Sequence, residues 1–341
     1  MIKNTRVIFA QRPVGEPGDD CFRLEQCDVP ELAENEILIK VCWLSLDPYM
    51  RGRMNDVKSY AAPMEVGDVM IGESAGIVLK SRSDKFQVGD RVTAHRGWQS
   101  YVISRDDDPR LMKVDTDNGT LSAHLGVVGM PGRTAYFGLT EVGKPKEGET
   151  LVVAAASGAV GSVVGQIAKL KGLRVVGIAG GPKKCRFVKE ELHFDACIDY
   201  KAGNLANELA AACPNGIDVY FENVGGEVMR AVAPLLNPGA RVPICGYVSQ
   251  YNAEDITKAE TPFDILQKLD PLPEHRFFVV TEWMDRWVEA TRLLGNWVSE
   301  GRIHYRESIG EGLDNAPELF RGMLKGKNFG KQLVKIADEE L

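Results

Sequence analysis

The stretch Leu151-Val152-Val153-Ala154-Ala155-Ala156-Ser157-Gly158-Ala159-Val160-Gly161 decides the fold of this chain. It begins as an apolar strand, turns at small residues and opens a helical pattern that runs to about Lys171. The turn has the form G-x-G-x-x-G with Ala156 in the first position. In such a turn Gly158 lets the backbone approach a pyrophosphate, and Gly161 lets the helix pack closely on the strand. The N–H groups at the start of the helix then face the phosphates, so the segment predicts a dinucleotide site.

The segments that follow repeat the same order of strand, turn and helix. The predicted strands are Leu151–Ala155, Arg174–Ala179, Val219–Phe221, Arg241–Cys245 and Phe277–Val280. Strands that are apolar on both faces and are separated by helical patterns are typical of a parallel sheet with helices on each side. After Met284, apolar residues at helical spacing form one stripe, which we expect to face the core. From about residue 128 the sequence therefore predicts an α/β fold with a doubly wound parallel sheet.

The residues after the second strand indicate which dinucleotide fits. An enzyme that uses NAD places Asp or Glu roughly 20 residues past the glycines, on the ribose hydroxyls. Here the chain reads Gly180-Gly181-Pro182-Lys183-Lys184-Cys185-Arg186, and the first acidic residue is Glu190. Glycines leave room for a 2′-phosphate and the cations neutralise it, so the sequence predicts NADP(H). The competing interpretation is a solvated helix face, which we expect for two of Lys183, Lys184, Arg186 and Lys189.

The first 125 or so residues form short β-rich runs separated by turns such as Gly67-Asp68 and Gly89-Asp90. The predicted strands are Glu36–Trp43, Gly76–Leu79, Arg91–His95 and Tyr101–Ser104. This part of the chain is therefore predicted to be a compact β domain. The segment Phe329–Ile336 alternates in a way that suits a strand, and we expect it to return to the N-terminal domain.

Composition excludes several classes of protein. A length of 341 residues, at about 150 residues per domain, suggests two domains. The chain is 44% hydrophobic and 26% charged, as in an ordinary globular protein. Its 41 Lys and Arg against 48 Asp and Glu give a net charge of −7, which argues against nucleic acid as a partner. No run is long and apolar enough for a membrane span or a secretory signal, so we expect a cytoplasmic protein without a membrane partner.

Nucleophilic and metal chemistry lack their usual signatures. The seven cysteines form no C-x-x-C pair and are expected to be free thiols. The five histidines show no metal-ligand spacing, and no G-x-S-x-G elbow is present. Hydride transfer needs neither a nucleophilic side chain nor a metal. Reduction of a conjugated carbonyl does need a neutral donor near the carbonyl oxygen, where negative charge develops.

Tyrosine suits that role because its pKa of about 10 keeps it protonated at neutral pH. The tyrosines in Gly, Pro, Ser or Asn-rich segments near predicted strand ends are Tyr49, Tyr60, Tyr247 and Tyr251. The competing interpretation for any single aromatic residue is packing.

Several motifs together resemble one family. They are Leu46-Asp47-Pro48-Tyr49-Met50-Arg51, Gly129-Met130-Pro131-Gly132, Thr134-Ala135-Tyr136, Glu222-Asn223-Val224-Gly225-Gly226, Ser249-Gln250-Tyr251-Asn252 and Gly326-Lys327-Asn328-Phe329-Gly330-Lys331. The chain is similar to the leukotriene/prostaglandin reductase subgroup of the medium-chain dehydrogenase/reductase superfamily. Within it, the motifs most resemble those of bacterial NADPH-dependent curcumin reductases and plant alkenal double-bond reductases.

The resemblance implies a fold and an assembly. A β-rich, GroES-like catalytic domain is expected at residues 1–127 and 305–341, and a Rossmann domain that binds NADP at residues 128–304. A homodimer is also implied.

Residue by residue, the resemblance implies that the pyrophosphate is held by Gly158, Ala159, Val160 and Gly161. Lys184 and Tyr200 are expected to meet the 2′-phosphate. The residues expected along the rest of the cofactor are Asn223, Cys245, Gly246, Tyr251, Phe278, Val280 and Asn328. Tyr251 and Tyr49 are expected to be catalytic and to bind substrate, with Tyr60 as a further substrate-binding residue.

Two positions depart from known patterns. Zinc-dependent alcohol dehydrogenases of the superfamily carry G-H-E-x-x-G, in which His binds catalytic zinc, whereas this chain has Gly72 at the position of that His. Glycine offers no ligand atom, so we expect no metal. The second departure is Arg133, where the subgroup is expected to have an apolar residue.

The sequence thus predicts an NADPH-dependent reductase of the C=C bond in enones and alkenals, with hydride added to the β-carbon. The enolate oxygen would be held by Tyr251, by Tyr49 or by a ribose hydroxyl. A quinone reductase and a non-catalytic NADPH-binding module are the alternatives.

Overall fold

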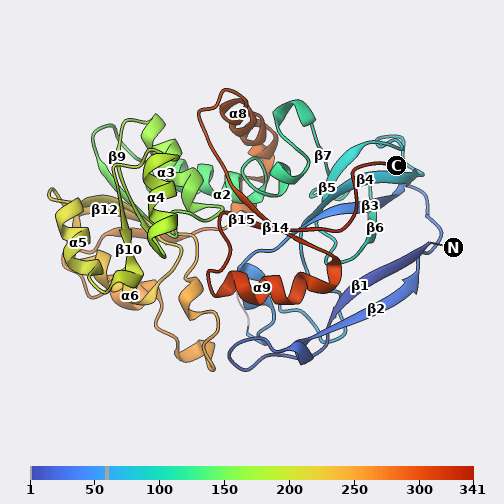
Figure 1. Cartoon of the computed structure of the whole chain (residues 1–341), viewed down its shortest axis with the longest axis horizontal. Helices are drawn as coiled ribbons and strands as arrows, with labels where there is room; N and C mark the ends of the chain where they lie inside the picture. The colour runs from blue at the N-terminus through green and yellow to red at the C-terminus, as the bar shows by residue number, and fades with distance from the viewer. Residues whose placement is uncertain (1, 58–60) are drawn as a thin grey trace. The chain divides into compact units, whose positions relative to one another are not determined.

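The computed structural model describes residues 2–57 and 61–341. The chain divides into two compact units (Figure 1). Unit 1 contains residues 1–126, 307–328 and 332–341, and unit 2 contains residues 127–306 and 329–331.

Unit 2 is built on a six-stranded parallel sheet. Its strands, in sheet order, are β10 (Ala196–Asp199), β9 (Arg174–Ala179), β8 (Thr150–Ala154), β11 (Ile217–Phe221), β12 (Leu236–Ile244) and β13 (Glu274–Phe277). The order reverses between β8 and β11, because the chain first builds outward through β9 and β10 and then starts again on the other side of β8. This is the doubly wound, Rossmann-like arrangement that the sequence predicts, and in sheets of this kind ligands bind at the point of reversal.

Helices cover the sheet. They are α2 (Met130–Phe137), α3 (Gly161–Leu170), α4 (Pro182–Glu190), α5 (Leu205–Ala212), α6 (Gly226–Val232), α7 (Pro262–Leu266) and α8 (Trp287–Ser299). Val152 and Ala154 of β8 pack in one core with residues of α5, α6 and α7. Leu151 and Val153, which point to the other face of the same strand, are equally buried. Burial on both faces explains why β8 is apolar at nearly every position.

One predicted strand is wrong in position. A strand is expected at Phe277–Val280, but β13 spans Glu274–Phe277 and so lies three residues earlier in the chain. It pairs in parallel with Arg241–Ile244. As an edge strand, β13 is polar and partly exposed, so apolar content does not mark it. The apolar residues that follow have another role: Phe278 is buried with its ring edge-to-face against Phe221.

Unit 1 is β-rich. Strands β1 (Lys3–Phe9) and β2 (Phe22–Asp28) form an antiparallel hairpin. A second sheet contains β14 (Glu307–Glu311), β15 (Lys331–Lys335), β3 (Glu36–Ser45), β4 (Ser74–Ser81), β5 (Arg91–Ala94) and β7 (Met112–Lys113), with β6 (Tyr101–Arg105) paired to β3. The strand predicted near the C-terminus is confirmed, because β15 pairs antiparallel with β3.

The core of unit 1 joins residues from both ends of the chain. The Trp98 ring is fully buried and lies 5.6 Å from the ring of Phe320, in α9 (Ala316–Leu324). Val7 of β1 and Val334 of β15 belong to the same core. The chain after residue 306 is therefore needed to complete this core.

All seven cysteines lie within the described residues and are free thiols, as predicted. Across residues 2–57 and 61–341, none of the helices has the length and apolar character that crossing a membrane requires.

Candidate active site

The turn between β8 and α3 is shaped by backbone contacts and by its two glycines. Ala155 adopts a left-handed backbone conformation with φ of 53°, and the Gly158 N–H donates to its carbonyl oxygen at 2.8 Å. A Cβ at Gly161 would lie 2.4 Å from the same oxygen, so the fold itself requires this glycine. A Cβ at Gly158 would approach no atom closer than 3.1 Å. The fold therefore requires glycine less strictly at position 158 than at position 161. We attribute the glycine at 158 to a ligand that approaches the backbone.

A segment from the end of the chain holds this turn in place. The N–H of Gly330 donates to the carbonyl oxygen of Ser157 at 3.1 Å, and Gly158 and Gly330 form a parallel bridge. Gly330 has φ of 78°, and a Cβ there would lie 1.9 Å from the carbonyl oxygen of Arg306. Its neighbour Phe329 packs edge-to-face on Phe187 of α4, with ring centroids 4.9 Å apart. Asn328, a predicted cofactor residue, directly precedes this segment and is grouped with unit 1.

A phenol and a lysine lie against the glycine that follows β9, and a second lysine is close enough to the first to feel its charge. A Cβ at Gly180 would lie 2.9 Å from the Tyr200 ring and 3.1 Å from Cε of Lys201. Lys184 is half-buried, and burial lowers its pKa, as does the neighbouring charge of Lys201. A bound anion would offset both effects. The cluster of Gly180, Lys184, Tyr200 and Lys201 therefore fits a phosphate monoester.

Lys201 is a cofactor candidate that the sequence prediction missed. It follows Tyr200 directly, and only the folding of the chain brings the pair against Gly180. We expected two of the four cations of α4 to be solvated. The structure instead exposes three of them, which are Lys183, Arg186 and Lys189. The buried face of α4 consists of Cys185, Phe187 and Val188, so only Lys184 is placed at its edge.

The turn after β11 is tied to the end of β8. The side-chain amide of Asn223 donates to the carbonyl oxygen of Ala154 at 2.8 Å. The carboxyl group of Glu222 is fully buried and accepts the N–H groups of Val224 and Gly225 at 2.6 and 2.9 Å. Burial raises the pKa of Glu222 to about 7, although both N–H groups oppose this shift. The carboxyl thus shapes the turn at the point where the strand order reverses.

The segment that follows β12 is bonded to the same turn. Val248 N–H donates to the carbonyl oxygen of Asn223 at 3.1 Å, and the Ser249 hydroxyl donates to that of Val224 at 2.6 Å. The Tyr251 hydroxyl lies over the segment and accepts the Tyr247 N–H at 3.4 Å.

Gly246 leaves room for that hydroxyl, because a Cβ at Gly246 would lie 2.7 Å from it. Cys245 donates its N–H to the carbonyl oxygen of Glu222 at 2.9 Å, and burial raises the pKa of its thiol to about 12. The structure thus brings together four predicted residues, which are Asn223, Cys245, Gly246 and Tyr251.

Phe278 and Val280, also predicted to line the cofactor, are buried. Phe278 donates its N–H to the carbonyl oxygen of Ile244 at 3.3 Å, and the carbonyl oxygen of Val280 accepts the indole N–H of Trp287 at 3.0 Å. Phe278 thus directly follows β13 and is bonded to Ile244, the last residue of β12, which precedes Cys245.

Tyr49 lies in unit 1, where it begins the short helix α1 (Tyr49–Arg53). Its hydroxyl oxygen is 2.8 Å from Nε2 of His95, and the two rings are stacked with centroids 6.3 Å apart. Burial, and then the charge of Arg110, lowers the pKa of His95 to about 4. His95 is a second residue that the sequence prediction missed. Tyr60, the third predicted tyrosine, lies outside the described residues.

Position 72 is enclosed by an aromatic ring. A Cβ at Gly72 would lie 2.9 Å from Cδ1 of Trp98 and 3.2 Å from the methyl group of Met50. A histidine in this backbone conformation would therefore require the buried Trp98 ring to move. Within the described part of the chain, no three His, Cys, Asp or Glu side chains gather as metal ligands would.

Arg133 stabilises the packing of two helices. It is buried in α2, and its guanidinium carbon lies 4.5 Å from the centroid of the Trp287 ring in α8. Its Nη1 donates to the Thr291 hydroxyl at 2.9 Å. The departure from the subgroup at this position is thus accommodated inside unit 2 by a cation–π contact and a hydrogen bond.

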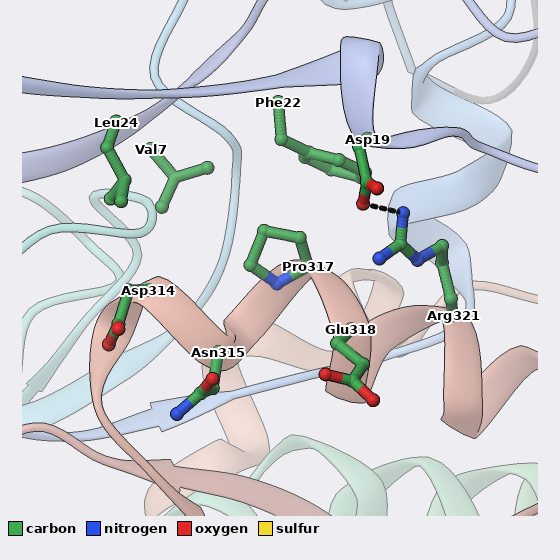
Figure 2. Close-up of a pocket in the computed structure, with 9 residues that line it drawn as sticks. All are labelled: Val7, Asp19, Phe22, Leu24, Asp314, Asn315, Pro317, Glu318 and Arg321. Atoms are coloured by element: carbon green, nitrogen blue, oxygen red, sulfur yellow. Dashed lines mark hydrogen bonds and ion pairs between the residues drawn. The ribbon is translucent and has the colours of Figure 1, made fainter.

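Figure 2 shows a hollow on unit 1, lined by Val7, Asp19, Phe22, Leu24, Asp314, Asn315, Pro317, Glu318 and Arg321. An ion pair joins Arg321 to Asp19 across it. None of the predicted site residues lines this hollow.

Comparison with known proteins places the chain in a family. Residues 5–114 match the family described as the N-terminal domain of oxidoreductase, and residues 159–268 match the family described as zinc-binding dehydrogenase. The chain belongs to the medium-chain dehydrogenase/reductase superfamily, as its two units and glycine turn indicate.

Full-length relatives define the family within it. NADPH-dependent curcumin reductase of Escherichia coli (strain K12) is 49% identical over 341 residues, which cover 99% of this chain and 98% of that protein. Prostaglandin reductase 1 of Rattus norvegicus is 43% identical over 327 residues, covering 94% and 95%. The crystal structure of CurA in complex with NADPH from Vibrio vulnificus has a TM-score of 0.91 at 49% identity, covering 98% and 99%. The chain belongs to the family of these reductases, so the resemblance drawn from its motifs is confirmed.

Proposed function

We propose that this chain uses NADPH to reduce the C=C bond of α,β-unsaturated carbonyl compounds, enones and alkenals in particular. The observation that carries the proposal is full-length identity of 49% to an NADPH-dependent curcumin reductase. Tyr200 and Lys201 against Gly180, with Lys184 close to Lys201, support the choice of NADPH over NADH. The chain is thus an NADP-dependent oxidoreductase that acts on a CH–CH group.

The cofactor residues divide by the part of NADPH that they would hold. The backbone of Gly158, Ala159, Val160 and Gly161 would bind the pyrophosphate, and Lys184, Tyr200 and Lys201 the 2′-phosphate. Asn223, Cys245, Gly246, Tyr251, Phe278, Val280 and Asn328 would line the remainder. When bound, NADPH supplies the hydride that adds to the β-carbon of the substrate.

A phenol hydroxyl would stabilise the charge that develops on the carbonyl oxygen. Tyr251 and Tyr49 are the residues that we assign to this role, with a ribose hydroxyl as a third possible donor. A neutral donor suits the reaction, because it strengthens its hydrogen bond as the oxygen becomes an enolate. Tyr60 is assigned to substrate binding on the family resemblance alone.

We assign no metal to the reaction. The support is Gly72, which has no ligand atom and whose surroundings are filled by Trp98 and Met50. Unit 1 is assigned as the catalytic, GroES-like domain and unit 2 as the NADP-binding domain, with proposed bounds of 1–127 with 305–341 and 128–304. The homodimer and the cytoplasmic location stay predictions. Light scattering of the purified protein measures the first.

A substrate comparison tests the proposal. Oxidation of NADPH is followed with an alkenal, with a curcuminoid and with a simple quinone, and products are analysed by mass. We expect both conjugated carbonyls to gain two hydrogen atoms. Turnover of the quinone alone would instead make the chain a quinone reductase. NADPH binding without turnover across a broad enone panel would make it a non-catalytic binding module.

A further inference from the structure

The Tyr49 hydroxyl contacts an ionisable side chain of unit 1. His95 follows strand β5 directly, and its Nε2 lies 2.8 Å from the Tyr49 hydroxyl oxygen. The two rings are nearly parallel, at 27°, so the contact is made with the imidazole stacked beside the phenol. Both side chains are half-buried. The geometry restricts both the ring and the hydroxyl of Tyr49.

Arg110 determines which nitrogen of His95 carries the hydrogen. Its Nη1 lies 3.4 Å from Nδ1 of His95. A guanidinium group only donates hydrogen bonds, so Nδ1 must accept, and the hydrogen of the neutral ring is on Nε2. We assign this tautomer from the hydrogen-bond network. His95 therefore donates to the Tyr49 hydroxyl oxygen, and the hydroxyl hydrogen points away from the imidazole.

Burial keeps the His95 ring neutral, because it contributes most to the lowered pKa, followed by the charge of Arg110. Arg53 acts in the same direction. The backbone carbonyl of His95 itself and the charge of Asp47 favour the protonated ring and oppose the shift. With a pKa of about 4, His95 is neutral at physiological pH and acts as a donor without bringing a positive charge. A hydroxyl that accepts a hydrogen bond is polarised into a better donor.

We propose that His95 is a positioning residue for the reaction, which fixes the Tyr49 hydroxyl as a donor to the substrate carbonyl oxygen, and that Arg110 maintains the tautomer that makes this possible. The inference rests on the proposed function. His95 itself contacts no substrate in this assignment and acts only through Tyr49. Removing the His95 imidazole should therefore lower kcat only when the Tyr49 hydroxyl is present.

A double-mutant cycle tests this dependence. The variants are Tyr49→Phe, His95→Phe and the double variant, each measured for kcat and KM with an enone and for NADPH affinity. Because the hydrogen bond from Tyr49 strengthens as charge develops on the substrate oxygen, we expect His95→Phe to lower kcat by at least about tenfold. NADPH affinity should not change. In the Tyr49→Phe background, the His95→Phe change should cause no further loss.

Two further variants separate orientation from packing. In His95→Gln the side-chain amide N–H occupies roughly the place of Nε2–H, so most of kcat should return. Arg110→Met releases Nδ1 and admits the other tautomer, so kcat should fall several-fold, again only when Tyr49 is intact. His124 is a matched control, because it is a buried histidine of the same unit whose Nε2 lies 3.2 Å from the carbonyl oxygen of Asp115. His124→Gln should leave kcat unchanged.

Several results would overturn the inference. Wild-type kcat in His95→Phe would exclude the role, and so would an equal loss from that change with and without the Tyr49 hydroxyl, which indicates packing alone. If His95→Phe does not fold, as judged by its Tm, the comparison of His95→Gln with the shorter His95→Asn decides, since only glutamine reaches the hydroxyl. A wild-type protein that reduces no enone contradicts the proposed function instead. An active Tyr49→Phe variant removes the residue through which His95 is said to act.

Discussion

The backbone N–H of Gly225 donates a 2.9 Å hydrogen bond to the buried carboxyl group of Glu222, three residues earlier in the chain. Gly225 has φ of 75°, a conformation that favours glycine. The carboxyl therefore stabilises a turn whose backbone favours glycine at position 225, at the carboxyl end of β11. Its position in a fully buried site links the shape of this turn to pH.

Glu222→Gln is expected to change how stability depends on pH. Because burial raises the folded-state pKa of Glu222 from 4.5 to about 7, its contribution to stability is fully present below about pH 4.5 and is lost as pH rises through 7. Glutamine keeps an oxygen for the two N–H groups and cannot ionise. Relative to the wild type, the variant should therefore gain up to ~3 kcal/mol in the free energy of unfolding between pH 5 and pH 8. Urea unfolding at both pH values measures this.

Glu227→Gln is the control for that experiment. Glu227 is exposed on α6, so the substitution removes a carboxylate near the same turn without removing a buried one. A pH-independent difference between Glu222→Gln and the wild type would contradict the prediction.

Alanine substitutions at the two glycines of the turn between β8 and α3 should affect different properties, which are stability for Gly161 and NADPH affinity for Gly158. Gly161→Ala places a Cβ 2.4 Å from a backbone oxygen, so it should lower the Tm clearly. Gly158→Ala meets nothing closer than 3.1 Å, so it should fold but bind NADPH at least about tenfold more weakly, because the methyl group occupies the approach of the pyrophosphate. Calorimetric Tm and NADPH titration separate the two effects. Unchanged NADPH affinity in Gly158→Ala would exclude a pyrophosphate at this turn.

Lys184→Ala and Lys201→Ala are each expected to weaken NADPH binding about tenfold or more while changing NADH binding little. Each variant loses a charge-assisted hydrogen bond to the 2′-phosphate of NADPH. NADH lacks that phosphate, so its binding has no such bond to lose. Binding titrations with both dinucleotides give the ratio. Lys183→Ala, at the exposed neighbouring position, should leave both affinities unchanged. An equal loss for NADPH and NADH would mean that the changed lysine does not contact the 2′-phosphate.

Tyr251→Phe should lower kcat by about tenfold to a hundredfold with an enone and leave NADPH affinity nearly unchanged. The lost hydroxyl would act in the transition state, and its contact with the Tyr247 N–H, at 3.4 Å, is too long to contribute much stability. Steady-state kinetics with a conjugated carbonyl checks the first part, and NADPH titration the second. Turnover equal to wild type would leave Tyr49 or a ribose hydroxyl as the donor.

Local patterns predicted much of unit 2. The strand, turn and helix around Gly158 lie within about twenty residues, so the glycine spacing and the apolar strand β8 indicate them directly. The alternation after Phe329 likewise predicted β15. The edge strand β13 was misplaced because its residues are polar, and its location depends on pairing with β12 rather than on its own composition.

The missed site residues share one property. His95 lies far along the chain from Tyr49, and its contact depends on the pairing of β5 within the sheet of unit 1. Lys201 reaches Gly180 only because β10 pairs in parallel with β9 and brings their ends to one edge. Such contacts are consequences of tertiary structure, and no motif within either segment encodes them.

The hydrogen bond between Gly330 and Ser157 joins two parts of the chain that lie far apart in the sequence. Closing so long a loop costs conformational entropy, which the assembled strands of the parallel sheet must first offset. The glycine loop is therefore completed by the tertiary fold and not by its own residues. A peptide that carried only β8, the turn and α3 would contain every glycine of the motif and would lack the bond that fixes Ser157.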